Sequence, residues 1–150
     1  MNPTVLVTGG SGYIAGFLIR RGWDSGKARK FSMLVFAAMM PIASMAVLAE
    51  SPILAVGLVA LATSAHQGLS ANLYTTISDV FPKQAVASVI GIGGCAGGFG
   101  GTLFSAILAG LIVTAFGYTP LILGMGVMHL IAVFVVHRLM GDLRPLTIKD

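Results

Sequence analysis

The sequence predicts an all-α integral membrane protein with four complete transmembrane helices and a partial helix at its N-terminus. Hydrophobic residues make up 56% of the 150 residues and charged residues only 9%, whereas a water-soluble domain carries about a quarter charged residues. Three stretches hold no Lys, Arg, Asp or Glu: residues 31–49, 51–78 and 84–136. A helix crosses a bilayer with about 20 apolar residues, so the composition indicates a multi-pass membrane protein and excludes a soluble domain.

The three charge-free stretches divide into four expected spans. The first two stretches are each long enough for one crossing, and the third, with roughly 50 residues, is long enough for two. The sequence "FGYTP" at residues 116–120 interrupts the third stretch. There, Gly117 can end one helix and Pro120 can begin the next. The four expected spans lie near residues 31–49, 53–78, 85–115 and 119–138.

The placement of positive charge predicts how the chain crosses the membrane. All nine Lys and Arg residues lie in a cluster at residues 20–30, at Lys83, or after the last apolar stretch. Short cytoplasmic loops collect Lys and Arg, so we expect these three places to share the cytoplasmic side of the cell membrane. The candidate residues of the basic loop are Arg21, Lys27, Arg29 and Lys30. The expected parts of this single membrane domain are residues 1–19 as a partial helix or altered N-terminus, 20–30 as a basic cytoplasmic loop, 31–138 as four transmembrane helices and 139–150 as a cytoplasmic tail.

Cysteine and histidine usage predicts no metal site and no cofactor. Cys95 is the only cysteine, so neither an internal disulfide nor a multi-cysteine metal motif is expected. The three histidines, His66, His129 and His137, lack the spacing of metal ligands. The net charge of +4 would suit nucleic acid, but its confinement to the ends of the apolar stretches favours a membrane and excludes that partner.

The opening residues resemble a dinucleotide-binding loop. In "TGGSGYIAG", Gly9, Gly12 and Ala15 have the spacing that lets a backbone turn tightly against a pyrophosphate. An NAD-binding oxidoreductase is therefore one alternative. That fold also needs an acidic residue about 20 positions further on, yet residues 30–40 contain no Asp or Glu. A membrane span follows in place of a second strand, so we expect a protein that is not an enzyme.

One face of the second expected span is polar. With residues placed 100° apart around a helix, six polar side chains fall within about 120° of one another. They are Thr63, His66, Gln67, Ser70, Tyr74 and Ser78. A polar stripe in lipid is costly unless it faces protein or water. These residues are therefore the candidates for a substrate path, with hydrogen bonding between helices as the alternative.

Three further polar groups carry individual expectations. An ordinary imidazole changes charge near neutral pH, so His66 is expected either to relay a proton or, when neutral, to donate a hydrogen bond to a carboxylate or hydroxyl. His129 lies in an otherwise apolar span and is expected to pack against a polar neighbour. Asp79, at the inner membrane edge, is expected to contact Lys83 in a loop or gate.

The third expected span contains the glycine-rich sequence "GIGGCAGGFGG". Glycines spaced four residues apart let two transmembrane helices approach closely. A bendable helix that helps alternating access is the alternative. The candidate packing and gating residues are Gly93, Gly94, Gly97, Gly98 and Gly101.

Three segments resemble one family of membrane transporters. The stretch "SGYIAGFLIRRGWDSGKARKFSM" is similar to the cytoplasmic loop between helices eight and nine of bacterial hexuronate transporters, in the anion:cation symporter branch of the major facilitator superfamily. The similarity continues through "ATSAHQGLSANLYTTISDVFPKQAVASVIGIGGCAGGFGGTLFSAILAGLI" and ends with "VVHRLMGDLRPL". It covers about residues 12–146, and its most specific part runs from His66 to Gly101.

The resemblance implies a transporter of two six-helix halves, of which this chain holds the end of helix eight and all of helices nine to twelve. It implies proton-coupled uptake of a hexuronate or related sugar-acid anion. The implied partners are the lipid bilayer, the substrate, the proton and a missing N-terminal half. That half holds most of the family's charged site residues, so none is carried over, and we expect a fragment that is inactive alone. An autonomous four-helix permease acting as a homo-oligomer is the alternative.

Reporter fusions test the expected topology. Fusions placed after Gly26, Gln84 and Asp150 should all report the cytoplasm, because the regions around them carry all the Lys and Arg residues. The measurement is the activity of a reporter that works on only one side of the membrane. An external signal at any of the three positions would contradict the assignment.

Overall fold

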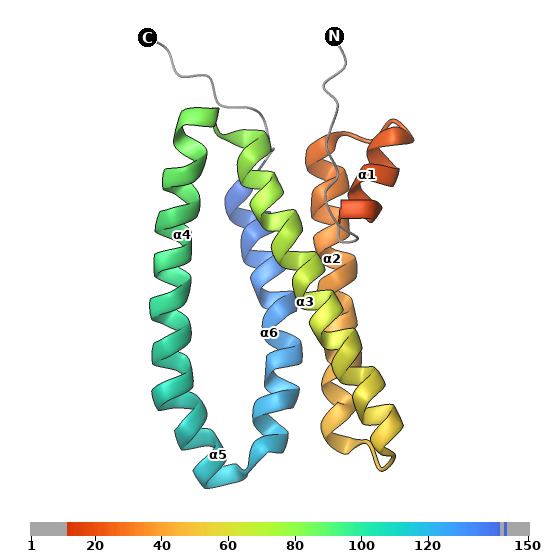
Figure 1. Ribbon diagram of the computed structural model, residues 1–150, viewed down its shortest axis with the longest axis vertical. Coiled ribbons are helices and arrows are strands. Elements are labelled where there is room, and N and C mark those ends of the chain that lie inside the picture. The colour runs from red at the N-terminus through yellow and green to blue at the C-terminus, as the bar shows by residue number, and fades with distance from the viewer. Residues whose placement is uncertain (1–11, 142, 144–150) are drawn as a thin grey trace.

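Helices dominate the structure, a computed structural model that describes residues 12–141 and 143 (Figure 1). In chain order the elements are α1 (Tyr13–Arg20), α2 (Ser25–Ser44), the 3-10 helix η2 (Met45–Leu48), α3 (Pro52–Val80), α4 (Lys83–Leu103), the π-helical stretch η3 (Phe104–Ala109), α5 (Gly110–Phe116) and α6 (Tyr118–Met140). No strand occurs among these described residues. The predicted all-α fold is confirmed, whereas Thr8 to Ser11 of the glycine-rich opening lie outside the described residues.

Four helical segments are long and apolar enough to cross a membrane, as predicted. Their bounds are Ser25–Leu48, Pro52–Val80, Lys83–Phe116 and Tyr118–Met140. Each extends beyond its expected span at one or both ends, although the first stops at Leu48, one residue before its expected end. The break expected within "FGYTP" is confirmed. Gly117 adopts φ +78° and its N–H donates to the carbonyl of Val113 at 2.9 Å, which ends α5.

The first span begins inside the expected basic loop, at Ser25. The preceding Asp24 causes this early start. Its carboxylate accepts a hydrogen bond from the backbone N–H of Lys27 at 3.1 Å, which satisfies one of the donors left free at the start of a helix. Arg29 and Lys30 consequently project from α2 and not from a loop.

Helix α2 lies between α3 and α6 and packs against both. Its buried small side chains are Ala28, Ser32, Ala37, Ala43 and Ser44. In lipid, apolar side chains gain little by leaving the solvent, so helices associate through close van der Waals packing of such small residues. Met33 of α2 and Val133 of α6 meet in a buried apolar cluster, and Leu69 of α3 packs against it.

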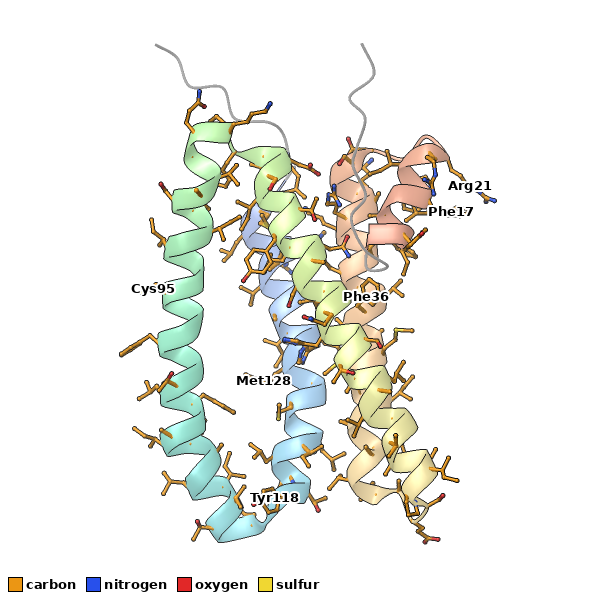
Figure 2. The ribbon with its side chains drawn as sticks, viewed as in Figure 1. Phe17, Arg21, Phe36, Cys95, Tyr118 and Met128 are labelled. Atoms are coloured by element: carbon orange, nitrogen blue, oxygen red, sulfur yellow. The ribbon has the colours of Figure 1, made fainter. Side chains whose placement is uncertain are left out.

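Two glycines mark close approaches between these helices. A Cβ added to Gly126 of α6 would lie 2.6 Å from Ser44 Oγ and 3.1 Å from the Cα of Pro41, both on α2. A Cβ added to Gly68 of α3 would lie 2.5 Å from the ring of Phe36, which Figure 2 labels. Glycine is therefore the residue that lets α3 and α6 reach α2 at these points.

Helices α4 and α5 are held mainly at their ends. Neither contains a buried residue. Helix α4 contacts α3 and α5 contacts α6, while Figure 1 shows the ribbon of α4 standing apart from the other spans over most of its length. One face of α4 is therefore left without a partner among the described residues.

The close approach at Gly126 can be tested by adding one methyl group. We expect Gly126→Ala to lower the free energy of unfolding by about 1–3 kcal/mol, the usual cost of overpacking, because Ser44 and the Pro41 backbone leave no room. Thermal unfolding in detergent, followed by circular dichroism, measures the change.

Gly124→Ala is the matched control, since Gly124 lies on the same helix and an added Cβ there meets nothing within 4 Å. It should be neutral or stabilising by up to about 1 kcal/mol, because alanine favours helices over glycine. Equal effects of the two substitutions would show that α6 does not approach α2 at Gly126.

Candidate functional site

Helix α3 has two polar faces with different surroundings. The predicted stripe is largely uncovered: Ser70 is half-buried, and the exposed members are Thr63, His66, Gln67, Tyr74 and Ser78. On the other side Asn72 and Thr76 are buried, and Thr76 Oγ1 donates to the Asn72 carbonyl at 2.7 Å. The structure thus gathers the six stripe residues on one accessible face and turns Asn72 and Thr76 inward.

Two hydroxyls of the stripe already use their protons within the helix. Thr63 Oγ1 lies 3.0 Å from the carbonyl of Ala60, and Ser78 Oγ lies 3.3 Å from the carbonyl of Tyr74. A hydroxyl that donates to its own helix keeps its oxygen lone pairs as acceptors. These positions therefore offer acceptors to a ligand that carries hydroxyl groups.

His66 forms a hydrogen bond that the sequence did not predict. Its Nδ1 lies 3.2 Å from Nε2 of His129 on α6, and the two rings meet edge to face at 5.5 Å between centroids. The expectation that His66 donates to a carboxylate or hydroxyl is wrong, because its partner is an imidazole. These residues are 63 positions apart, and their spacing in sequence carries no signal of contact.

The bonds of His129 fix which nitrogen carries each proton. His129 Nδ1 lies 2.9 Å from the carbonyl of Met125, and a carbonyl only accepts, so this nitrogen must donate. When His129 is neutral, its Nε2 is therefore an acceptor. His66 then donates from Nδ1, and its own Nε2 is left as an acceptor. One proton therefore lies between the two rings and joins α3 to α6.

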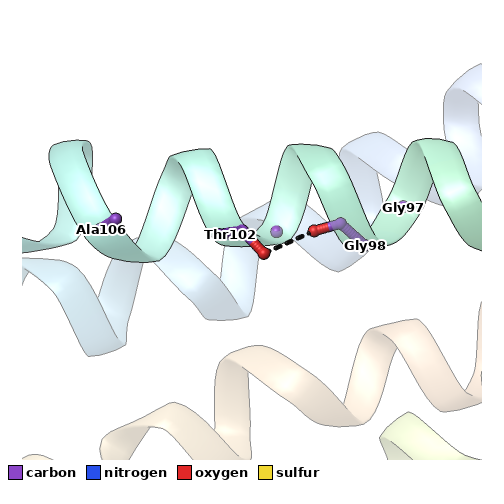
Figure 3. A pocket seen from close by; sticks show the side chains of 5 residues that line it. Gly97, Gly98, Thr102 and Ala106 are labelled. Carbon is purple, nitrogen blue, oxygen red and sulfur yellow. Dashed lines mark hydrogen bonds between the residues drawn. The ribbon is translucent and has the colours of Figure 1, made fainter.

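The glycine-rich face of α4 is open. A Cβ added to any of the five candidate glycines, Gly93, Gly94, Gly97, Gly98 and Gly101, meets nothing within 4 Å. Gly97, Gly98, Gly101, Thr102 and Ala106 line a hollow of about 570 Å³ on this helix (Figure 3). Beside this hollow, Thr102 Oγ1 donates to the carbonyl of Gly98, one turn earlier on the same helix, at 2.8 Å. The expected close helix contact is not made by any described part of this chain and stays a prediction.

Asp79 pairs with Arg29, which corrects the expected contact with Lys83. Its Oδ2 accepts from Arg29 Nε at 2.6 Å and from Ser25 Oγ at 3.1 Å. The side chain of Arg29 is 5% exposed and that of Asp79 is 39% exposed, so the guanidinium depends on this carboxylate. The pair ties the start of α2 to the end of α3.

The other basic residues that the structure describes gather at the same end, which we call the basic end. Lys30 Nζ donates to the carbonyl of Gly141, directly after α6. The guanidinium of Arg21 lies over the ring of Phe17 at 4.4 Å from its centroid, and both are labelled in Figure 2. The starts of α2 and α4 and the ends of α3 and α6 therefore share one end of the bundle (Figure 1).

Comparison with characterised proteins supports the family resemblance. A hexuronate transporter of Escherichia coli K12 is 32% identical over 109 residues, 73% of this chain and 25% of that protein. A D-galactonate transporter of Escherichia coli O6:H1 is 25% identical over 134 residues, 89% of this chain and 31% of that protein. The chain is a homologue of sugar-acid transporters of the major facilitator superfamily.

These homologues do not support the alternative of an NAD-binding oxidoreductase. The sugar-acid transporters that the chain matches are not enzymes. The chain spans about a quarter to a third of the length of these curated relatives, 25% of one and 31% of the other. No protein-family model matches the chain, and no solved structure matches it significantly.

Substitution of Asp79 tests the corrected ion pair. Asp79→Asn leaves the Arg29 guanidinium buried without a carboxylate, and we expect a loss of about 2 kcal/mol in stability. This is less than the loss from breaking a fully buried pair, about 3–5 kcal/mol, because water reaches part of Asp79. Thermal unfolding in detergent gives the value.

Lys83→Gln is the control, because Lys83 is exposed at the start of α4 and should change stability by less than about 0.5 kcal/mol. If Lys83→Gln instead destabilises the chain as much as Asp79→Asn, the contact expected from the sequence is the correct one.

Proposed function

We propose that this chain forms part of a secondary transporter in a bacterial inner membrane that takes up sugar-acid anions, hexuronates or close relatives, together with protons. The polar face of α3 carries the proposal. Six polar side chains share this accessible face while the opposite face packs against α2, as expected of a helix that lines a water-filled path. The names of the matched transporters, for hexuronate and D-galactonate, indicate the substrate class.

The chemistry of this face suits the neutral part of such a substrate. Sugar acids carry several hydroxyl groups and one carboxylate. Hydroxyl oxygens of the stripe can accept from substrate hydroxyls, the Gln67 amide can both donate and accept, and the ring of Tyr74 offers a flat apolar surface. These groups recognise a polyol and do not neutralise a carboxylate.

The carboxylate of the substrate needs a cation that these spans do not supply. Residues 51–78 and 84–136 contain no Lys or Arg, and an unpaired anion inside a membrane is strongly disfavoured. A second group of helices must therefore contribute the positive charge and close the path. For this reason we propose that the chain by itself does not transport.

The His66–His129 pair is our candidate for the proton. Imidazole gains and loses a proton near neutral pH, and the pair joins α3 to α6. The described parts of α2, α4 and α6 that lie within the bilayer carry no Lys, Arg, Asp or Glu. The other titratable side chains on the four spans are Tyr74, Cys95 and Tyr118, with His137 at the membrane edge. An added proton would therefore alter the contact between α3 and α6 without competing charges nearby.

The open face of α4 is our candidate for the contact with that second group of helices. Glycine leaves backbone exposed and allows another helix to pack closely. The hollow beside Gly97 and Thr102 would receive side chains from such a partner. Because α4 is held mainly at its ends, it can also adjust its tilt as the path opens and closes.

Uptake assays test this function. The chain alone, reconstituted in vesicles, should take up no glucuronate or galacturonate, and joining it to helices one to eight of a related transporter should restore uptake. In that hybrid Gln67→Ala should lower uptake about fivefold, as expected for a lost hydrogen bond of about 1 kcal/mol. Gln84→Ala, an amide outside the stripe, is the control.

The histidine pair is tested in the same hybrid. His66→Ala and His129→Ala should each impair proton-coupled uptake, and the double substitution should cost no more than one alone, because the residues act as a unit. His137→Ala, at the membrane edge, is the control. Robust uptake by the 150-residue chain alone would replace this proposal with an autonomous oligomeric permease.

A further inference from the structure

A second feature lies between α2 and α6. At the basic end, α2 and α6 enclose a groove of about 460 Å³. Its apolar walls include Phe31, Leu34, Leu130 and Phe134, and its rim is formed by Lys27, Lys30 and His137. No residue of α3 or α4 lines it, so the groove is separate from the proposed substrate path.

The groove opens to the surroundings of the bundle. Phe31 is 43% exposed, Leu34 49% and Phe134 56%. The floor is closed by the buried side chains of Met33 and Val133, which belong to the core between α2 and α6. The groove is therefore a surface feature with a solid apolar base, and in a membrane the surroundings of these side chains are lipid.

The rim carries an excess of positive charge. Lys27 and Lys30 are three residues apart on α2 and so lie on one face of the helix. Lys30 is held at the groove by its hydrogen bond to the Gly141 carbonyl, and the guanidinium of Arg138 lies over the Phe134 ring at 4.9 Å. The carboxylate of Asp24 caps α2 by accepting the Lys27 N–H, and Asp79 is paired with Arg29; neither lines the groove.

The level of the groove in the membrane follows from its aromatic neighbours. Trp23 packs against Phe31 with 5.6 Å between ring centroids. Tryptophan prefers the level of the lipid headgroups, and the charge-free part of α2 begins at Phe31. The cationic rim therefore lies at the headgroup level and the apolar walls extend toward the acyl chains.

From this geometry we propose that the groove binds an anionic phospholipid, such as phosphatidylglycerol. The phosphate contacts Lys27 and Lys30, and one acyl chain lies between α2 and α6 against Leu34 and Phe134. Basic pockets between transmembrane helices bind acidic headgroups in this way. Charge complementarity at the rim and an apolar groove directly below it select a lipid over a soluble anion, which would leave the walls exposed. The inference does not depend on sugar-acid transport.

The single tryptophan of the chain reports on this site. The full chain is reconstituted in vesicles in which either phosphatidylglycerol or phosphatidylcholine carries brominated acyl chains, which quench nearby tryptophan fluorescence. Trp23 should be quenched more strongly by the brominated anionic lipid at equal bromine content. Lys27→Gln and Lys30→Gln should each reduce this preference about fivefold, the effect expected for one lysine near an anionic headgroup.

Lys83→Gln is the matched control, since Lys83 lies at the basic end but outside the groove, and it should leave the preference unchanged. Equal quenching of the unmodified chain by the two lipids would overturn the proposal without any variant. So would an equal loss in Lys83→Gln, which would reveal general surface attraction. Relief of quenching by millimolar glycerol phosphate would show a site for a soluble anion. Circular dichroism of each variant confirms that the helices are retained.

Discussion

The packing of α2 against both α3 and α6 is the contact on which the other features depend. In lipid, this packing cannot draw on the hydrophobic effect and rests on how closely the backbones approach. Alanine and serine on α2, and single glycines on its two neighbours, provide that approach. The Arg29–Asp79 pair closes the same contact at the basic end, where water begins. Because α2 uses its small residues in this way, the polar stripe of α3 is turned away from it.

This arrangement gives the bundle surfaces with different chemistry. The polar stripe of α3 and the glycine face of α4 have hydrogen-bonding groups and exposed backbone but no charge. The α2–α6 groove has apolar walls and a cationic rim. A polar, uncovered face is costly in lipid, whereas an apolar groove is not. The stripe and the glycine face therefore suit contact with protein or water, and the groove suits contact with the bilayer.

The sequence predicts what depends on composition and periodicity. Charge-free stretches located the four spans, Gly117 located the break between the last two, and the 100° spacing grouped the stripe of α3. Partner choice across helices was not predictable in this way. Asp79 lies four residues from Lys83 yet pairs with Arg29, 50 residues away, because the start of α2 is packed beside the end of α3. Likewise the row of glycines on α4 predicted a close contact between helices, while the close approaches that the structure shows are at Gly68 on α3 and Gly126 on α6. A helical wheel identifies a face of a helix but not the neighbour that will cover it.

The position of α6 also sets the order in which the bundle can be completed. Lys30 and its acceptor on Gly141 are 111 residues apart, and nearly the whole described chain lies between them. During synthesis α2 and α3 emerge before α6 and can pair at once, but the second face of α2 must wait until α4 and α5 have been made and α6 returns. In that interval α2 has α1 and α3 beside it but lacks its contact with α6. Among the described spans, the packing around α2 is therefore completed only when α6 arrives, and a ribosome that stalls after α5 leaves α2 partly uncovered.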